Sequence, residues 1–297
     1  MSYPQKATLT PTLEALAILP KSWWPILQQT FAAWNLHDAP RLGASLAFYT
    51  ILSLAPLVIL VVALVALVFG YSTAQNQIFN EVRNLIGPEG ALAVKTAIEH
   101  AQEPSSGLFA SALGILTLFF GASGVFLELR SALNTIWEVP PSPTLGLKAL
   151  IHERFFSFGM VLAIGFLLLV SLVLSAWLAA AGSYFGEFLP VPELALSAVN
   201  FLVSFAATAV LFGLIFRFVP DKTIPWRQLW LGALATAFLF TVGNVLIGLY
   251  LGKASVGSAY GAAGSLIVVI VWVYYSSQIF FFGAEFTHTL AKHQAKG

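Results

Sequence analysis

Charged side chains that interrupt long apolar runs are the residues with the clearest chemical potential in this sequence. Glu285 is the leading case, because Ile279-Phe-Phe-Phe-Gly-Ala precedes it and Phe286 follows it. Ionisable residues at such positions are rare in membrane helices and are functional hypotheses by default. Four further charged residues are expected at the same end of neighbouring apolar runs. They are Arg41, Glu128, Arg130 and Arg217.

This charged cluster has two interpretations. In the functional one, Glu285 pairs with Arg41, Arg130 or Arg217 and forms a cytoplasmic gate or a proton-coupled site. In the structural one, the same groups form an ion-pair cluster that fixes helix order, or they extend separately to the headgroups. We favour the structural interpretation, because charges at the membrane rim reach water at little cost.

A second polar set is expected toward the opposite side of the membrane. The segment from Gly252 to Gly264 is rich in glycine, which allows sharp turns and close backbone approach. One interpretation is a re-entrant or broken element that lines a substrate cavity. Irregular backbone at membrane depth is stable only when it is buried in protein or lines a water-filled cavity. The other is an external loop with small-residue helix packing. The polar cavity lining would comprise Asn200, Asn244, Ser255, Ser258 and Tyr260.

The composition excludes several classes of protein. The chain is 58% hydrophobic and 9% charged, with a mean hydropathy of +0.85, whereas soluble domains carry about 25% charged residues. A net charge of +1 gives no basic face for nucleic acid, so we expect no nucleic-acid partner. No cysteine is present, which excludes disulfides and thiolate metal sites. No phosphate-binding loop of the GxxxxGK[ST] type occurs, and we expect no cofactor.

Six charge-poor runs must position these groups, and each is long enough to cross a bilayer. About 20 apolar residues span the roughly 30 Å hydrocarbon core. The first run, Leu42–Asn80, contains no Asp, Glu, Lys, Arg or His and is most apolar at Ser45–Gly70. The sequence therefore predicts an all-α membrane protein with six transmembrane helices. The other five runs centre on Leu108–Leu127, Phe155–Ala181, Leu194–Phe216, Leu229–Leu251 and Ala262–Ala284.

Basic residues in the connections predict the orientation. With the N-terminus inside, eleven lysines and arginines lie on the cytoplasmic side and only Arg83, Lys95 and Lys253 lie outside. Cytoplasmic loops carry an excess of these residues, so both termini are predicted to be cytoplasmic. The expected organisation is an interfacial N-terminal segment at 1–40, a membrane domain at 41–287 and a cytoplasmic tail at 288–297.

Additional amphipathic helices are expected outside the spans. Lys21–Asn35 carries Trp23, Leu27, Phe31 and Trp34 on one face, so this helix either lies in the headgroup plane or packs on the cytoplasmic ends of the protein. Two helices are predicted in the external segment 71–107, at Ala74–Ile86 and Glu89–Ala101, divided by Gly87-Pro88. The segment either caps the outer mouth of the helix bundle or is a solvated loop.

A kink is also expected within the first span. Pro56 removes one backbone hydrogen bond from the helix, and Thr50 and Ser53 are candidates to satisfy the freed carbonyls.

Several separated motifs resemble the YihY / virulence factor BrkB family. The first span opens with Arg41-Leu-Gly-Ala-Ser-Leu-Ala-Phe-Tyr-Thr-Ile-Leu-Ser-Leu-Ala-Pro56, and the second ends with Gly124-Val-Phe-Leu-Glu-Leu-Arg-Ser-Ala-Leu-Asn-Thr-Ile-Trp137. Further matches are Arg217-Phe-Val-Pro-Asp221, Tyr260-Gly-Ala-Ala-Gly-Ser-Leu266 and the run from Trp272 to Phe286. The resemblance covers roughly Phe31 to the C-terminus. It implies a bacterial inner-membrane protein with six spans.

The family has also carried a ribonuclease label, which this sequence does not support. Metal-dependent RNA cleavage requires clustered His and Asp or Glu ligands, and the five histidines are scattered, with Glu285 and His288 as the nearest pairing. We therefore expect that the protein is not an enzyme. The favoured function is a transporter or flippase-like protein for a small solute, ion or lipid. The alternative is a non-transporting scaffold or envelope-integrity factor. Membrane lipids and an unknown substrate are the expected partners, and small-residue helix faces permit a homodimer.

Overall fold

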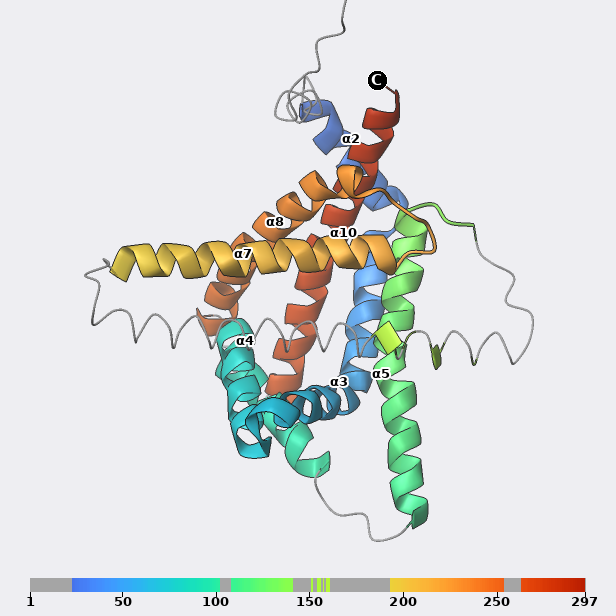
Figure 1. Ribbon diagram of the computed structural model, residues 1–297. Helices are drawn as coiled ribbons and strands as arrows, with labels where there is room; N and C mark the ends of the chain where they lie inside the picture. The colour runs from blue at the N-terminus through green and yellow to red at the C-terminus, as the bar shows by residue number, and fades with distance from the viewer. Residues whose placement is uncertain are drawn as a thin grey trace, which may run out of the picture.

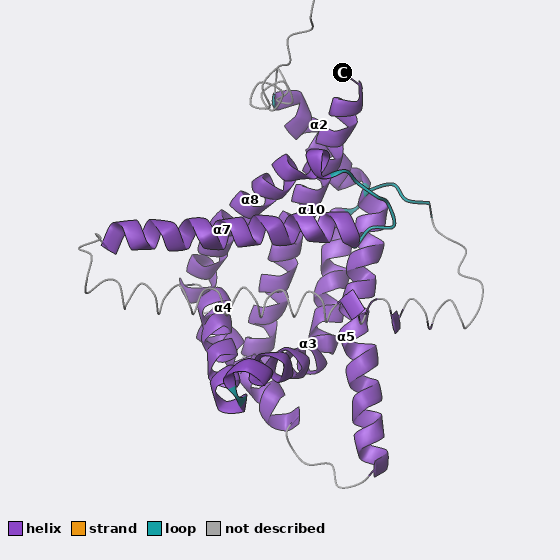
Figure 2. Cartoon of the chain, viewed as in Figure 1, coloured by secondary structure: helices purple, strands orange, loops and turns teal. Residues whose placement is uncertain are grey.

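The chain folds into long helices throughout the part that the computed structural model describes (Figure 1, Figure 2). The described residues are 23–101, 108–140, 193–253 and 263–296, with isolated positions 151, 154, 155, 157, 159 and 160. The helices are α2 (Trp24–Leu36), α3 (Ala39–Phe69), α4 (Tyr71–Ala101), α5 (Leu108–Ile136), α7 (Glu193–Phe218), α8 (Trp226–Lys253) and α10 (Gly264–Lys296).

Helix α10 is the central element of the arrangement. It contacts α2, α3, α4, α5 and α8. In Figure 1 the C-terminal end of α10 lies beside α2, and α4 lies toward the other end of the molecule. Helix α7 runs across α8 and α10 in this view rather than alongside them, so the described helices do not form one parallel set. Phe280 of α10 packs on Phe212 and Phe216 of α7, with ring centroids 5.7 and 5.2 Å apart.

Helices α8 and α10 interlock through two reciprocal glycine–threonine contacts. Thr236 of α8 fills the space that a side chain at Gly283 of α10 would occupy, and Thr287 of α10 does the same at Gly232 of α8. Each threonine hydroxyl donates to the carbonyl one turn earlier in its own helix, Thr236 to Gly232 and Thr287 to Gly283, both at 2.7 Å. The hydroxyls are therefore satisfied internally, and small residues allow the backbones to approach closely.

Three of the described helices are long and apolar enough to cross a membrane. The stretches are Phe201–Phe218, Trp226–Tyr250 and Gly264–Gln294. A bent pair in α3, Ala39–Leu54 with Leu57–Leu67, raises the number to four if it is one span. Helix α5 occupies the second predicted run, and most of the third run, from 161 to 181, lies outside the described residues.

The predicted kink in the first span is confirmed. The two parts of α3 are inclined by 63° on either side of Pro56. The predicted role of the neighbouring hydroxyls differs from the structure, however. Thr50 donates to the Leu46 carbonyl at 2.7 Å, and Ser53 donates to the Gly121 carbonyl of α5. Ser53 therefore links α3 to α5 instead of satisfying a carbonyl freed by the proline.

The two helices predicted in segment 71–107 are present as the halves of α4. The helix is interrupted at Gly87, whose φ of 82° is in the left-handed region, where glycine is unstrained. Ala74 and Val94 are buried against Val58, Val62 and Val65 in the second part of α3. The segment is thus packed on the protein and is not an extended solvated loop.

Helix α2 packs on the protein with one face and exposes another. Ile26 is fully buried against Phe286 and Leu290 of α10. Two members of the predicted stripe, Leu27 and Phe31, remain 40% and 58% exposed. The helix therefore rests on α10, as one of the two predicted placements has it, and presents an apolar face outward.

Candidate functional site

The most unusual polar group of the described structure is the carboxylate of Glu285. Its side chain is fully buried on α10, and Oε1 lies 2.6 Å from Nδ1 of His37. His37 is 14% exposed. The two residues are 248 positions apart in sequence, so the pair exists only because α10 packs against the junction of α2 and α3.

The junction of α2 and α3 positions His37. It is the two-residue turn His37-Asp38, and Asp38 has a φ of 56°, a left-handed conformation that Asp tolerates better than most residues. The turn is closed by hydrogen bonds from the His37 amide to Ala33 and from the Asp38 amide to Asn35, at 2.9 and 3.1 Å. A fixed turn therefore holds the imidazole over α10.

The second oxygen of Glu285, Oε2, is buried and has no hydrogen-bond partner among the described residues. A buried carboxylate normally has both oxygens satisfied, because an unpaired charge in an apolar site is costly. One histidine contact does not complete the set of acceptor interactions that a carboxylate can make. The two carboxylate oxygens of Glu285 therefore differ. Oε1 has a hydrogen-bond partner, and Oε2 has none among the described residues.

The structure corrects the predicted partner of Glu285, which is His37 and none of the three arginines. Arg41 pairs with Asp38 at 2.7 Å on the surface, and Arg130 pairs with Asp221. The Arg217 guanidinium donates to the Ile224 carbonyl at 2.6 Å and lies over the Trp226 ring. Glu128 is half-buried on α5.

The Arg130 and Asp221 contact belongs to a clamp between the end of α5 and the connection from α7 to α8. Asp221 accepts from Arg130 Nε at 3.1 Å and Nη2 at 2.5 Å, and from Asn134 Nδ2 at 2.7 Å. The Asp221 amide donates back to Asn134 Oδ1 at 2.8 Å. The predicted charged cluster therefore divides into this structural clamp and the separate pair of His37 and Glu285.

Replacing Asp221 with asparagine is expected to lower the free energy of unfolding by about 1–2 kcal/mol, because hydrogen bonds to charged groups are the stronger ones. Asp38→Asn is the matched control. It weakens an exposed pair worth at most about 1 kcal/mol. Thermal unfolding of the detergent-purified protein measures both. Equal shifts for the two variants would show that the clamp adds nothing beyond a surface ion pair.

A further charged pair closes the same end of the molecule. Lys292 of α10 contacts Glu138, just after α5, at 2.7 Å. The hydrogen bond from Lys292 lowers the pKa of Glu138. The stability that the pair of Lys292 and Glu138 contributes is fully present at pH values above the ordinary pKa of a glutamate. It is lost as the pH falls through the lowered pKa. Both side chains are about half exposed, so the effect is small.

The predicted polar cavity is only partly within the described structure. Ser255, Ser258 and Tyr260 lie outside the described residues, as does the side chain of Asn200. Asn244 is half-buried on α8. The nearby groove of about 420 Å³ is lined by α2, α8 and α10 and includes Gly243, Gln278 and Trp34, but its lining does not include Asn244.

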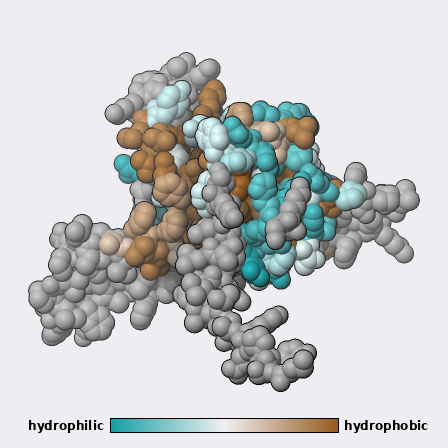
Figure 3. Space-filling view, turned by 90° about the horizontal axis from the view of Figure 1, so that it is seen from above, coloured by the Kyte–Doolittle hydropathy of each residue, from teal (hydrophilic) through white to brown (hydrophobic). Residues whose placement is uncertain are grey.

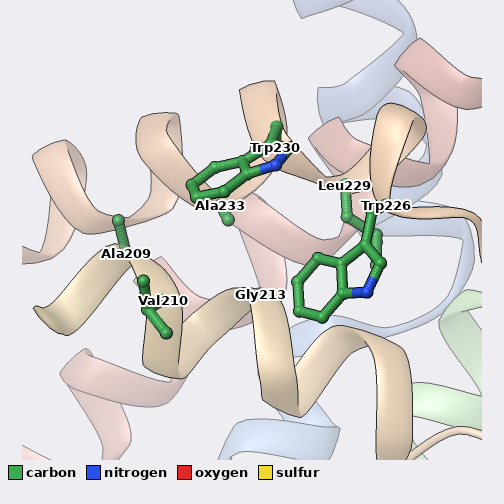
Figure 4. A pocket seen from close by; sticks show the side chains of 7 residues that line it. All are labelled: Ala209, Val210, Gly213, Trp226, Leu229, Trp230 and Ala233. Carbon is green, nitrogen blue, oxygen red and sulfur yellow. The ribbon is translucent and has the colours of Figure 1, made fainter. Parts of the chain in front are cut away.

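A smaller pocket of about 140 Å³ separates parts of α7 and α8 (Figure 4). Trp226 and Trp230 of α8 lie along it, and Gly213 of α7 leaves room for the Trp226 indole. Both tryptophans are more than a third exposed, as expected for residues of an interfacial aromatic belt. The lining is apolar and has no group suited to catalysis.

Comparison with known proteins places the chain in a family. The family described as virulence factor BrkB matches residues 30–297. The chain belongs to the virulence factor BrkB family. This confirms the resemblance drawn from the separated sequence motifs. No solved structure is significantly similar.

The relatives of this BrkB-family chain include several named membrane proteins. It is 28% identical over 253 residues to a UPF0761 membrane protein of Ralstonia nicotianae, which covers 84% of this chain and 55% of the relative. A UPF0761 membrane protein of Neisseria meningitidis serogroup B is 27% identical over 259 residues, covering 86% and 61%. The chain thus spans little more than half the length of these relatives.

One relative matches over nearly its whole length. It is a Bacillus subtilis protein named ribonuclease-like, YfkH, which is 24% identical over 274 residues, covering 90% of this chain and 96% of the relative. Among the described residues, no group of three or more His, Cys, Asp or Glu side chains is placed to hold a metal ion.

His37 is the site residue that sequence reasoning missed. The only local signal was a histidine at the end of an amphipathic helix beside the first span. Nothing in that signal identifies a carboxylate near the other end of the chain as its partner.

Proposed function

We propose that this BrkB-family protein moves a small solute, an ion or a lipid across the bacterial inner membrane. The observation that carries the proposal is the fully buried Glu285, whose second oxygen finds no partner in the part of the chain that the structure describes. A carboxylate that only fixed helix order would be more stable with both oxygens paired or replaced by an apolar residue. Intramembrane ionisable groups that remain open mark pathways for ions and substrates.

The proposed topology has six spans with both termini in the cytoplasm. Its support is the gathering of basic residues at one end, where Arg130, Lys222 and Lys292 contact the neighbouring connections. Seen from that end, hydrophilic residues gather on one side of the described surface, with some hydrophobic residues among them, and hydrophobic residues predominate on the other side (Figure 3). An excess of lysine and arginine is characteristic of the cytoplasmic side.

Reconstitution into liposomes tests the proposal with three probes: a fluorescent phospholipid, rubidium ions and glycerol. We expect at least one probe to move faster than in protein-free liposomes, and this movement to be lost in Glu285→Gln. Glu81→Gln is the control, because Glu81 is an exposed carboxylate on α4. If no probe moves, the scaffold alternative is favoured. If Glu285→Gln transports normally, Glu285 is outside the pathway.

We also propose that the protein is not a nuclease. Metal-assisted hydrolysis requires ligands that converge on one ion, and the five histidines are scattered along the sequence. Transfer RNA incubated with the purified protein and Mg²⁺ is expected to remain intact. Cleavage that disappeared in Glu285→Ala would overturn this expectation.

A further inference from the structure

The pair of His37 and Glu285 connects a partly exposed side chain to a fully buried one. The Glu285 side chain has no exposed surface, whereas that of His37 is 14% exposed. Nδ1 of His37 contacts Glu285, and the described structure gives Nε2 no hydrogen-bond partner. Histidine can accept a proton at one ring nitrogen while releasing another from the second nitrogen. The imidazole is therefore placed between the carboxylate and the protein surface.

The surroundings of Glu285 limit what can bind there. Neither the groove between α2, α8 and α10 nor the pocket between α7 and α8 includes Glu285 in its lining. The described residues also place no third acidic or histidine ligand for a metal ion. A proton is the one ligand that needs no cavity, because it adds no volume to the carboxylate.

Besides His37, the titratable and charged groups close to Glu285 are few. From α10 they are Lys292 and His288, and from the segment after α5 Glu138. Lys292 and Glu138 are paired with each other, and His288 packs on Trp137 with ring centroids 4.9 Å apart. Beside His37, Arg41 and Asp38 are paired with each other on the surface. The α8 residues that pack on this part of α10, Gly232 and Thr236, carry no charge.

We propose that the pair of His37 and Glu285 is a proton-binding site, with His37 as its entrance from the water. A proton from a water-borne acid binds Nε2 of His37, and the proton on Nδ1 passes to Oε1 of Glu285. The net change is one proton added to the carboxylate, and the imidazole is left neutral with its proton on Nε2. The inference rests on the proposed function, since it names the proton as the ion coupled to transport.

Infrared difference spectroscopy of the full-length protein in detergent, recorded against pH, tests the site directly. A protonated carboxyl group has a C=O band separate from that of a carboxylate. We expect such a band to grow as the pH is lowered across the pH range in which the purified protein stays folded. It should be absent in Glu285→Gln and retained in Glu81→Gln.

A second variant keeps the test independent of whether Glu285→Gln folds. His37→Gln preserves a hydrogen-bonding side chain and the carboxyl group but cannot carry a titrating proton. We expect it to shift the midpoint of the band by at least about one pH unit, a tenfold change in proton affinity. A midpoint unchanged in His37→Gln would exclude His37 as the entrance. A wild-type spectrum with no titrating carboxyl band in this pH range would overturn the proposal.

The outcome separates the two proposals. A titrating Glu285 band in a protein that transports none of the probes would leave the proton site standing and remove the transport function. Transport that requires Glu285, without a titrating band, would leave the function standing and remove the proton site.

Discussion

Replacing Gly283 with alanine is expected to lower the free energy of unfolding by about 1–3 kcal/mol, the usual cost of overpacking a tight interface. A Cβ at this position would lie 2.6 Å from Cγ2 and 2.8 Å from Cβ of Thr236. These distances are well inside van der Waals contact, and both groups belong to helices that cannot separate without losing their packing. Thermal unfolding of the detergent-purified protein measures the effect.

Two further variants make this prediction specific. Gly248→Ala is the control on α8, because a Cβ there would meet nothing within 4 Å, and the change is expected to be neutral or slightly stabilising. Combining Gly283→Ala with Thr236→Ala removes the hydroxyl and methyl groups that clash and should restore part of the lost stability. If Gly283→Ala were as stable as Gly248→Ala, α8 and α10 would not be in close contact here.

Replacing His37 with alanine is expected to have the largest effect, a loss of about 3–5 kcal/mol, because it removes the one partner that the described residues give a fully buried carboxylate. The second change Glu285→Leu should restore much of this stability, since an apolar residue of similar size removes the uncompensated charge. The free energy of unfolding of the single and double variants forms a mutant cycle.

His293→Ala is the control for this cycle. His293 lies farther along α10, is half-buried and does not contact Glu285, so its loss should cost less than about 1 kcal/mol. An effect of His37→Ala no larger than this control would show that the pair contributes little to the folded state.

The course of the helices was largely predictable from the sequence. The apolar runs of α3, α5, α7, α8 and α10, the bend at Pro56 and the interruption at Gly87 follow from residue type and local backbone chemistry. These features depend on neighbours within about one helical turn, where the rules for proline and glycine are strong.

The helix faces that pack on the protein, and the side chains that pair between helices, were much less predictable. The stripe predicted on α2 is apolar, but Ile26 and Thr30 of another face are the buried residues. Lipid and protein both accept apolar side chains, so hydrophobicity alone does not distinguish the face that packs on α10 from the face turned outward. Similarly, the charge of Glu285 indicates that a partner is needed. Only the packing of α10 on the turn between α2 and α3 identifies His37.

The length of α10 has a consequence for how the protein sits in its bilayer. Its 33 residues extend about 50 Å at about 1.5 Å each, and the hydrocarbon layer is only about 30 Å thick. A helix of this length close to the membrane normal projects from the hydrocarbon layer, and α2 packs on its C-terminal part. Membrane thickness then determines how far the aromatic side chains of α2 lie from the acyl chains. Lipids of different chain length would alter the environment of α2 without any change in the protein sequence.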